Sequence, residues 1–127
     1  MSRKNSTSIC FDLWPDGDKR LWSTAISVGN FLDPDGAASH WAAATKTQVQ
    51  KGYGKWIFHL DAENLLSCAK TSKPSSRVNE NSLRSFITRL EAQGLASQTI
   101  ASRLTDLTEA IRVMEPASDL SLLKKIS

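Results

Sequence analysis

The stretch TKTQVQKGYGKWIFHL, residues Thr45 to Leu60, decides how the rest of this chain is interpreted. On a helix with 3.6 residues per turn, the large apolar side chains of this stretch share one side. That side comprises Val49, Tyr53, Trp56, Ile57 and Leu60. The opposite side carries ammonium, amide and hydroxyl groups, which belong to Thr47, Gln48, Lys51 and Lys55. The pattern predicts an amphipathic helix with its apolar side in a core. From this stretch alone, a merely solvated polar side is the simpler interpretation.

Two glycines, Gly52 and Gly54, lie inside this predicted helix. Each costs about 1 kcal/mol relative to alanine in a helix interior. They indicate either that another backbone approaches the helix closely or that the helix is kinked.

The segments before this helix are short and separated by turn residues. Ile9–Trp14 is short and apolar, and Pro15 ends it. It is either a brief strand or an extended segment laid over the domain, and we favour the extended segment because it needs no partner strand. The following Pro-Asp-Gly-Asp is typical of a turn, and Asp18 is expected to cap a helix over Lys19–Val28. An alanine-rich stretch then predicts a short helical turn around Ala38–Trp41.

The second half of the chain has clearer helix boundaries. Residues 70–77 are rich in Ser and Lys and contain Pro, which predicts a loop. Asn79 is expected to cap a helix over Glu80–Gln93, and Gly94 to end it. Ser97 is expected to cap the next helix, which runs to Met114. This helix carries an apolar stripe of Ile100, Leu104, Leu107, Ile111 and Met114.

A last short helix, LSLLKKI at residues 120–126, is expected after a cap at Asp119. Helices joined by short loops, with no strand-like alternation, predict an all-α fold, a small orthogonal bundle of four to five helices. The 127 residues suit one such bundle. We divide the chain into an N-terminal arm with a short helix, residues 1–36, and a helical domain, residues 37–127.

Charge and composition narrow the class of protein. Sixteen Lys and Arg against thirteen Asp and Glu give a net charge of +3, which is compatible with nucleic acid without being diagnostic. Cys10 and Cys68 lack metal-ligand spacing, and a reduced pair is favoured over a disulfide. The sequence has no signal peptide and no run of about 18 apolar residues. We therefore expect a soluble cytoplasmic protein without a membrane segment.

Residues for catalysis are mostly missing. His40 and His59 have no carboxylate or thiol at ligand spacing, so no metal is predicted. No phosphate-binding glycine loop, nucleophile elbow or metalloprotease motif occurs, and no cofactor is predicted. Tyr53 is interpreted as a packed residue with its hydroxyl near the rim of the core. The chain itself is not expected to be an enzyme.

A second polar surface is expected at the start of the helix that follows Gly94. It comprises Gln98, Thr99, Ser102 and Arg103. A helix N-terminus carries a partial positive charge and outward N–H groups, which suits a phosphate. Such side chains also contact phosphates and base edges in nucleic acids. Two polar surfaces in one small basic domain favour nucleic-acid binding over simple solvation.

The order of these pieces resembles the N-terminal core-binding (SAM-like) domain of tyrosine recombinases, the phage-integrase family. The similar stretches are TKTQVQKGYGKWIFHL, VNENSLRSFITRLEAQGLASQTIASRLTDLTEAIRVM and DLSLLKKI. The segment LDPDGAASHWAAAT ahead of them is also similar to subsets of bacterial integrases, and the resemblance covers roughly residues 37–127. The resemblance implies a helical bundle that clamps one side of a double-stranded recombination site. A downstream catalytic domain closes the other side and carries out DNA integration.

The resemblance also assigns roles within this chain. It implies that two helices face the major groove, here Thr45–Leu60 and Ser97–Met114. The implied DNA contacts are Thr47, Gln48, Lys51, Lys55, Gln98, Thr99, Ser102 and Arg103. The last short helix would contact other protomers in a homo-oligomer on DNA.

One departure limits what the resemblance implies for this chain. The family's arginine, lysine, histidine and tyrosine machinery lies on the catalytic domain, which is absent here. We interpret the chain as a piece of a longer recombinase, in preference to a natural short relative without catalysis. Two alternatives stay open: a helical protein-interaction module that binds no nucleic acid, and a DNA-binding regulator that never had a catalytic domain.

Overall fold

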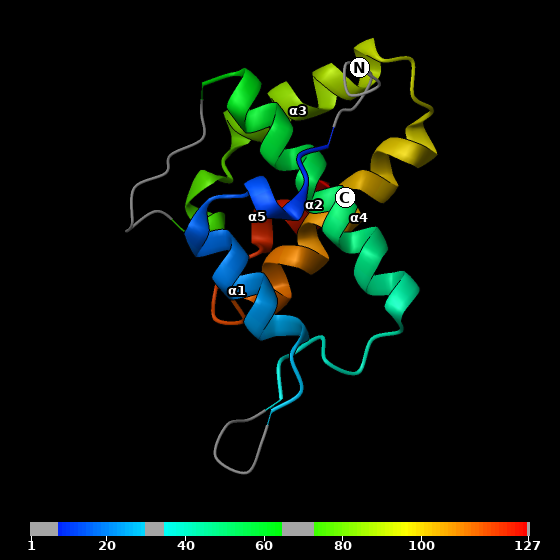
Figure 1. Cartoon of the computed structure of the whole chain (residues 1–127). Helices are drawn as coiled ribbons and strands as arrows, with labels where there is room; N and C mark the ends of the chain where they lie inside the picture. Colours follow the sequence, from blue (N-terminus) through cyan, green and yellow to red (C-terminus); the bar gives the residue numbers. More distant parts are fainter. Residues whose placement is uncertain (1–7, 30–34, 65–72, 127) are drawn as a thin grey trace.

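The computed structural model describes residues 8–29, 35–64 and 73–126, and these ranges contain helices and no strand (Figure 1). The predicted all-α bundle is confirmed. Its elements are α1 (Asp16–Ile26), α2 (Ala43–Ala62), α3 (Glu80–Ala92), α4 (Ser97–Met114) and α5 (Ser121–Ile126). Two 3-10 turns, η2 (Phe11–Leu13) and η3 (Pro74–Arg77), complete the described elements.

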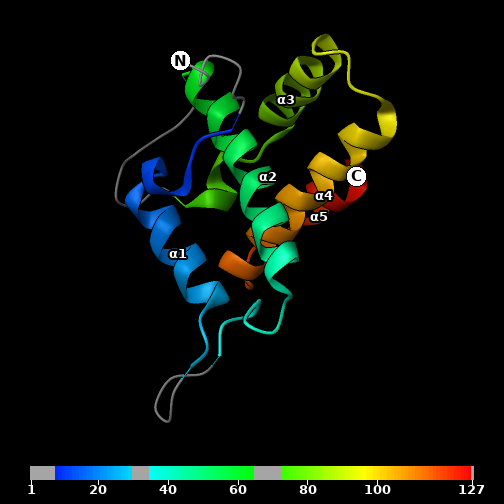
Figure 2. The same cartoon turned by 45° about the vertical axis from the view of Figure 1, so that its right-hand side comes forward.

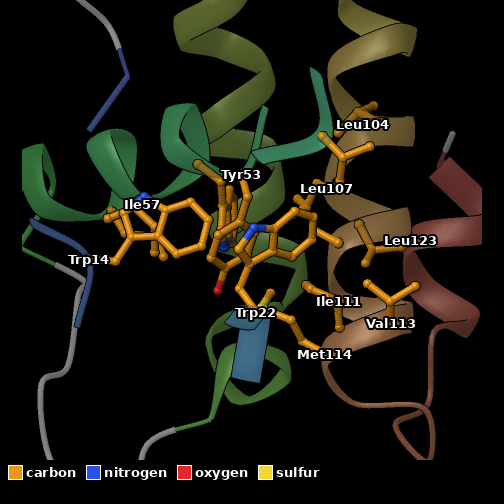
Figure 3. Close-up of a cluster of buried hydrophobic side chains, with 14 of the residues drawn as sticks. Trp14, Trp22, Tyr53, Ile57, Leu104, Leu107, Ile111, Val113, Met114 and Leu123 are labelled. Atoms are coloured by element: carbon orange, nitrogen blue, oxygen red, sulfur yellow. The ribbon is translucent and has the colours of Figure 1, made fainter. Parts of the chain in front are cut away.

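Helices α2 and α4 form the centre of the bundle. They make the most extensive contact between any two elements, and α2 crosses in front of α4 in Figure 2. The expected apolar side of α2 is confirmed, because all five of its large side chains are buried. On α4 the expected stripe is buried at Leu104, Leu107, Ile111 and Met114. Apolar periodicity thus placed the core correctly on both helices (Figure 3).

The N-terminal segment belongs to the same core. Trp14 is 3% exposed and Trp22 is fully buried, and the Trp14 ring packs edge-on against Tyr53 with ring centroids 5.0 Å apart. The backbone N–H of Ile9 donates to the carbonyl of Gly54 at 3.1 Å. Packing therefore does not divide the chain at residue 36. The segment expected to be extended does lie over the domain, but it contains the 3-10 turn η2.

The prediction that Asp18 caps a helix is wrong. Helix α1 begins at Asp16, three residues before the predicted start at Lys19, and follows Pro15. Asp18 is fully buried inside the first turns of α1, and its carboxylate accepts two hydrogen bonds from Arg77, at 2.8 and 3.0 Å. Tyr53 Oη donates to the same carboxylate at 2.5 Å, so this hydroxyl lies in the core and not at its rim.

The tyrosine in this buried cluster is a hydrogen-bond donor at any ordinary pH. Burial raises the pKa of Tyr53 well above its usual value, and the Asp18 charge raises it further. One carboxylate, one guanidinium and one hydroxyl thus satisfy each other where α1, α2 and η3 meet.

Several boundaries differ from expectation by one or two residues. Helix α2 extends the predicted Thr45–Leu60 by two residues at each end, and Ala38–Trp41 forms a turn without a regular helix. The predicted loop contains η3. Leu65 and Leu66 continue the apolar pattern, so the sequence indicates a helix that restarts after Asp61. Both leucines lie outside the described ranges, as does Cys68. Cys10 is exposed and has a free thiol.

The capping predictions have mixed outcomes. Asn79 caps α3, because its side chain accepts from Ser82 N, and Ser82 Oγ accepts from Asn79 N in return. Gly94 has φ of +80°, as the residue after a helix often does. Ser97 does not cap α4: it is the first helical residue, and the cap position is Ala96, without a side-chain bond. The Asp119 carboxylate accepts from Ser121 N at the start of α5.

Close approach, and not a kink, accounts for the two glycines of α2. A Cβ on Gly52 would lie 2.5 Å from Cβ of Asp106 on α4. A Cβ on Gly54 would lie 2.6 Å from the carbonyl oxygen of Ile9. Neither position has room for a side chain, so glycine allows α4 on one side and the N-terminal segment on the other to touch α2.

Candidate nucleic-acid interface

A groove with a volume of about 610 Å³ lies between the N-terminal halves of α2 and α4. We call it the α2–α4 groove. It is lined by Ala43, Ala44, Thr47, Gln48, Lys51, Gly52, Lys55, Arg103 and Asp106. Ala43, Ala44 and Gly52 are small and leave the groove open. The polar side chains of the lining come from successive turns of α2. The groove is therefore a concave surface built from two helices, with three cationic side chains and one carboxylate in its lining.

The structure brings together five of the eight residues predicted to contact DNA. Thr47, Gln48, Lys51 and Lys55 from α2 and Arg103 from α4 all line the groove. Thr47, Gln48 and Lys51 are exposed, whereas Lys55 and Arg103 are half-buried.

The other three predicted residues lie on the first turns of α4 and do not line the groove. They are Gln98, Thr99 and Ser102. Gln98 and Ser102 are exposed and Thr99 is half-buried. Their predicted role is thus not supported by the shape of the surface, although they remain on the same helix.

Three positive charges in the groove act on one another. Burial lowers the pKa of Lys55 below its usual value, and repulsion from Arg103 and Lys51 lowers it further. The repulsion shows that cations from both helices are close enough to interact. An anion bound between them would relieve this repulsion and would raise the pKa of Lys55.

The guanidinium of Arg103 is held at the edge of the groove. Its Nε is buried and has no hydrogen-bond partner among the described residues. A buried donor without a partner is costly, and an arginine presents its donors in a planar fork that matches phosphate oxygens. Arg103 is therefore suited to an anion that enters the groove.

Asp106 is the one acidic residue in the lining, and the sequence analysis did not single it out. Only 4% of it is exposed, and its Oδ1 accepts a hydrogen bond from Gln48 Nε2 at 3.3 Å. The pKa of Asp106 is raised above its usual value because burial is the largest effect. The Gln48 hydrogen bond and the Arg103 charge oppose this rise. One signal was available: Asp106 follows Arg103 by three residues, so the two share a side of the helix.

Within the described ranges, no three His, Cys, Asp or Glu side chains are grouped so that they could hold a metal ion. His59 is buried beside Trp56 and Phe86, and its Nδ1 accepts a hydrogen bond from Arg89 Nε at 2.8 Å. His59 Nε2 is buried without a partner among the described residues.

His59 is expected to make the fold sensitive to mild acid. Burial lowers its pKa below 6.5, and the Arg89 charge lowers it further, against a smaller opposing effect of Glu63. The unfolded chain therefore takes up this proton first as pH falls, and stability is lost from about pH 6.5 down through the folded pKa. Urea unfolding at pH 7.5 and 5.5 measures the loss, which cannot exceed about 1.4 kcal/mol per pH unit.

The second histidine supplies the matched control for this experiment. His40 is exposed, so His40→Gln is expected to leave the dependence on pH unchanged, whereas His59→Gln should flatten it. A free energy of unfolding that is equal at the two pH values in the original chain would contradict the role of His59.

Comparison with known proteins adds no relative: no protein-family model, no curated protein and no solved structure matches this chain. Among the described residues, no helix is both long and apolar enough to span a membrane.

Proposed function

We propose that this chain binds double-stranded DNA through the α2–α4 groove, as the core-binding domain of a site-specific tyrosine recombinase. The observation that carries the proposal is the convergence of Lys51 and Lys55 from α2 with Arg103 from α4 on one concave surface. In the sequence, Lys51 lies 52 residues before Arg103 and Lys55 lies 48 residues before it. Only the packing of α2 against α4 brings these side chains together.

The chemistry of the groove supports a nucleic acid. Phosphate contacts from lysine and arginine supply most of the affinity of proteins for DNA, and hydroxyl and amide side chains add contacts to phosphates and base edges. The groove offers three cations, one hydroxyl at Thr47 and one amide at Gln48. In the proposed complex the domain clamps one side of the recombination site, and cleavage belongs to a separate catalytic domain.

A salt titration of duplex binding tests the proposal. Lys51→Ala combined with Lys55→Ala is expected to weaken binding to a duplex about tenfold or more at low salt, because two charge-assisted contacts are lost. The slope of log K against log salt should become about 1.8 units less steep, at about 0.9 per phosphate contact. Fluorescence anisotropy with a labelled duplex measures both quantities.

A control with the same loss of charge separates the groove from net charge. Arg20 on α1 and Lys125 on α5 are exposed and do not line the groove. Arg20→Ala with Lys125→Ala should leave the slope almost unchanged. Equal weakening by both double variants would assign binding to overall charge, and an original chain that binds no duplex at low salt would remove the proposal. A protein-interaction module that binds no nucleic acid would show no duplex binding at low salt.

A further inference from the structure

We infer that Gln48 reads adenine in the major groove of the bound duplex, and that Asp106 is the positioning residue that orients the Gln48 amide for this contact. The inference rests on the proposed function and deepens it. It concerns base preference, whereas the lysines and Arg103 of the same groove concern phosphate contacts.

The buried Asp106 carboxylate determines the orientation of the Gln48 side-chain amide. An ionised carboxylate only accepts hydrogen bonds, so Asp106 Oδ1 requires the amide nitrogen of Gln48 on its side. The reversed amide would place its oxygen against a carboxylate oxygen. Burial raises the pKa of Asp106 on balance, and the Gln48 hydrogen bond and the Arg103 charge act against that rise, so both favour the ionised form.

Asp106 itself cannot easily move away from this arrangement. It is 4% exposed, and it lies against Gly52, where a Cβ would be only 2.5 Å from its own Cβ. The exposed glutamine is thus attached to a carboxylate held between two packed helices. Loss of rotamer freedom before binding lowers the entropy that a base contact would otherwise cost.

The groups that remain on Gln48 match one base. The hydrogen bond to Asp106 uses one N–H, and in the described part of the chain the Gln48 side chain makes no other hydrogen bond. One amide N–H and the amide oxygen remain, which are a donor beside an acceptor. Adenine presents the complementary pair, the N7 acceptor and the N6 donor. Guanine presents two acceptors there, and its O6 would face the amide oxygen.

Selection from a library of randomised duplexes tests the inference. The original chain is expected to enrich adenine over guanine at one position, by roughly 5- to 100-fold. Gln48→Ala should abolish this enrichment while the salt slope stays the same. Asp106→Asn lets the amide turn round, so guanine should become acceptable at that position. In the Gln48→Ala background, Asp106→Asn should change the base preference no further.

Matched variants keep the outcome interpretable. Gln98→Ala removes an exposed glutamine outside the groove and should leave the enrichment intact. Gln48→Ala alters an exposed side chain, so the base contact is tested even if Asp106→Asn fails to fold in a thermal unfolding control. Adenine enrichment that survives Gln48→Ala, or duplex binding without any base preference, overturns the inference and leaves the proposed function standing. Absence of all duplex binding overturns both.

Discussion

Arg77→Ala is expected to lower the free energy of unfolding by about 3–5 kcal/mol, measured by urea denaturation. The substitution leaves the Asp18 carboxylate fully buried with Tyr53 Oη as its remaining partner in this cluster. A buried charge that has lost its counter-charge keeps the full cost of lost hydration, and one hydroxyl donor offsets only part of that cost. The bidentate geometry, with bonds of 2.8 and 3.0 Å, makes the loss larger than for a single contact.

Two further variants show that the cost comes from the stranded charge. Arg84 pairs with Glu80 on the surface of α3, where both side chains are mostly exposed, and Arg84→Ala should cost less than about 1 kcal/mol. Replacing all three buried partners, as in Asp18→Leu with Arg77→Met and Tyr53→Phe, should restore most of the stability because neither a charge nor an unpaired hydroxyl is left buried. A loss under about 1 kcal/mol for Arg77→Ala would contradict the structural role given to the cluster.

The buried ion pair between Asp18 and Arg77 could not be predicted from the sequence. Asp18 follows a Pro-Asp-Gly turn, which is typical of a helix cap, and nothing nearby indicates a core position. Its partners are 35 and 59 residues away in the sequence. Local chemistry therefore favoured the cap, and tertiary packing decided otherwise. The apolar stripes of α2 and α4 were predictable because their 3.6-residue period depends on each helix alone.

The candidate interface could also be predicted only in part from the sequence. The polar side of α2 was identified from periodicity, and its four residues do line one groove. On α4 the prediction placed the contact at the helix start, but the helices cross farther along, so that Arg103 lines the groove while Gln98, Thr99 and Ser102 do not. The crossing point depends on which side-chain ridges of the two helices interdigitate, so it cannot be predicted from the sequence of either helix alone.

Gly52→Leu is expected to destabilise the fold by about 3 kcal/mol, because it separates the two central helices. Even a Cβ would lie 2.5 Å from Asp106 Cβ and 2.8 Å from its Oδ2. Gly52→Ala should cost less, about 1–2 kcal/mol, since the higher helix propensity of alanine returns about 1 kcal/mol. Urea denaturation of both variants measures the loss.

Two other glycines supply the controls for this prediction. Gly17 in α1 has open space around it, so Gly17→Ala should stabilise slightly, by up to about 1 kcal/mol. Gly54→Ala meets Ile9 and Ser8, which are only half-buried and can shift more easily than helix α4. It should therefore cost less than Gly52→Ala. Gly52→Ala that is neutral or stabilising would show that α2 and α4 can separate freely. The groove would then lack the fixed geometry that its cations and the Gln48–Asp106 pair require.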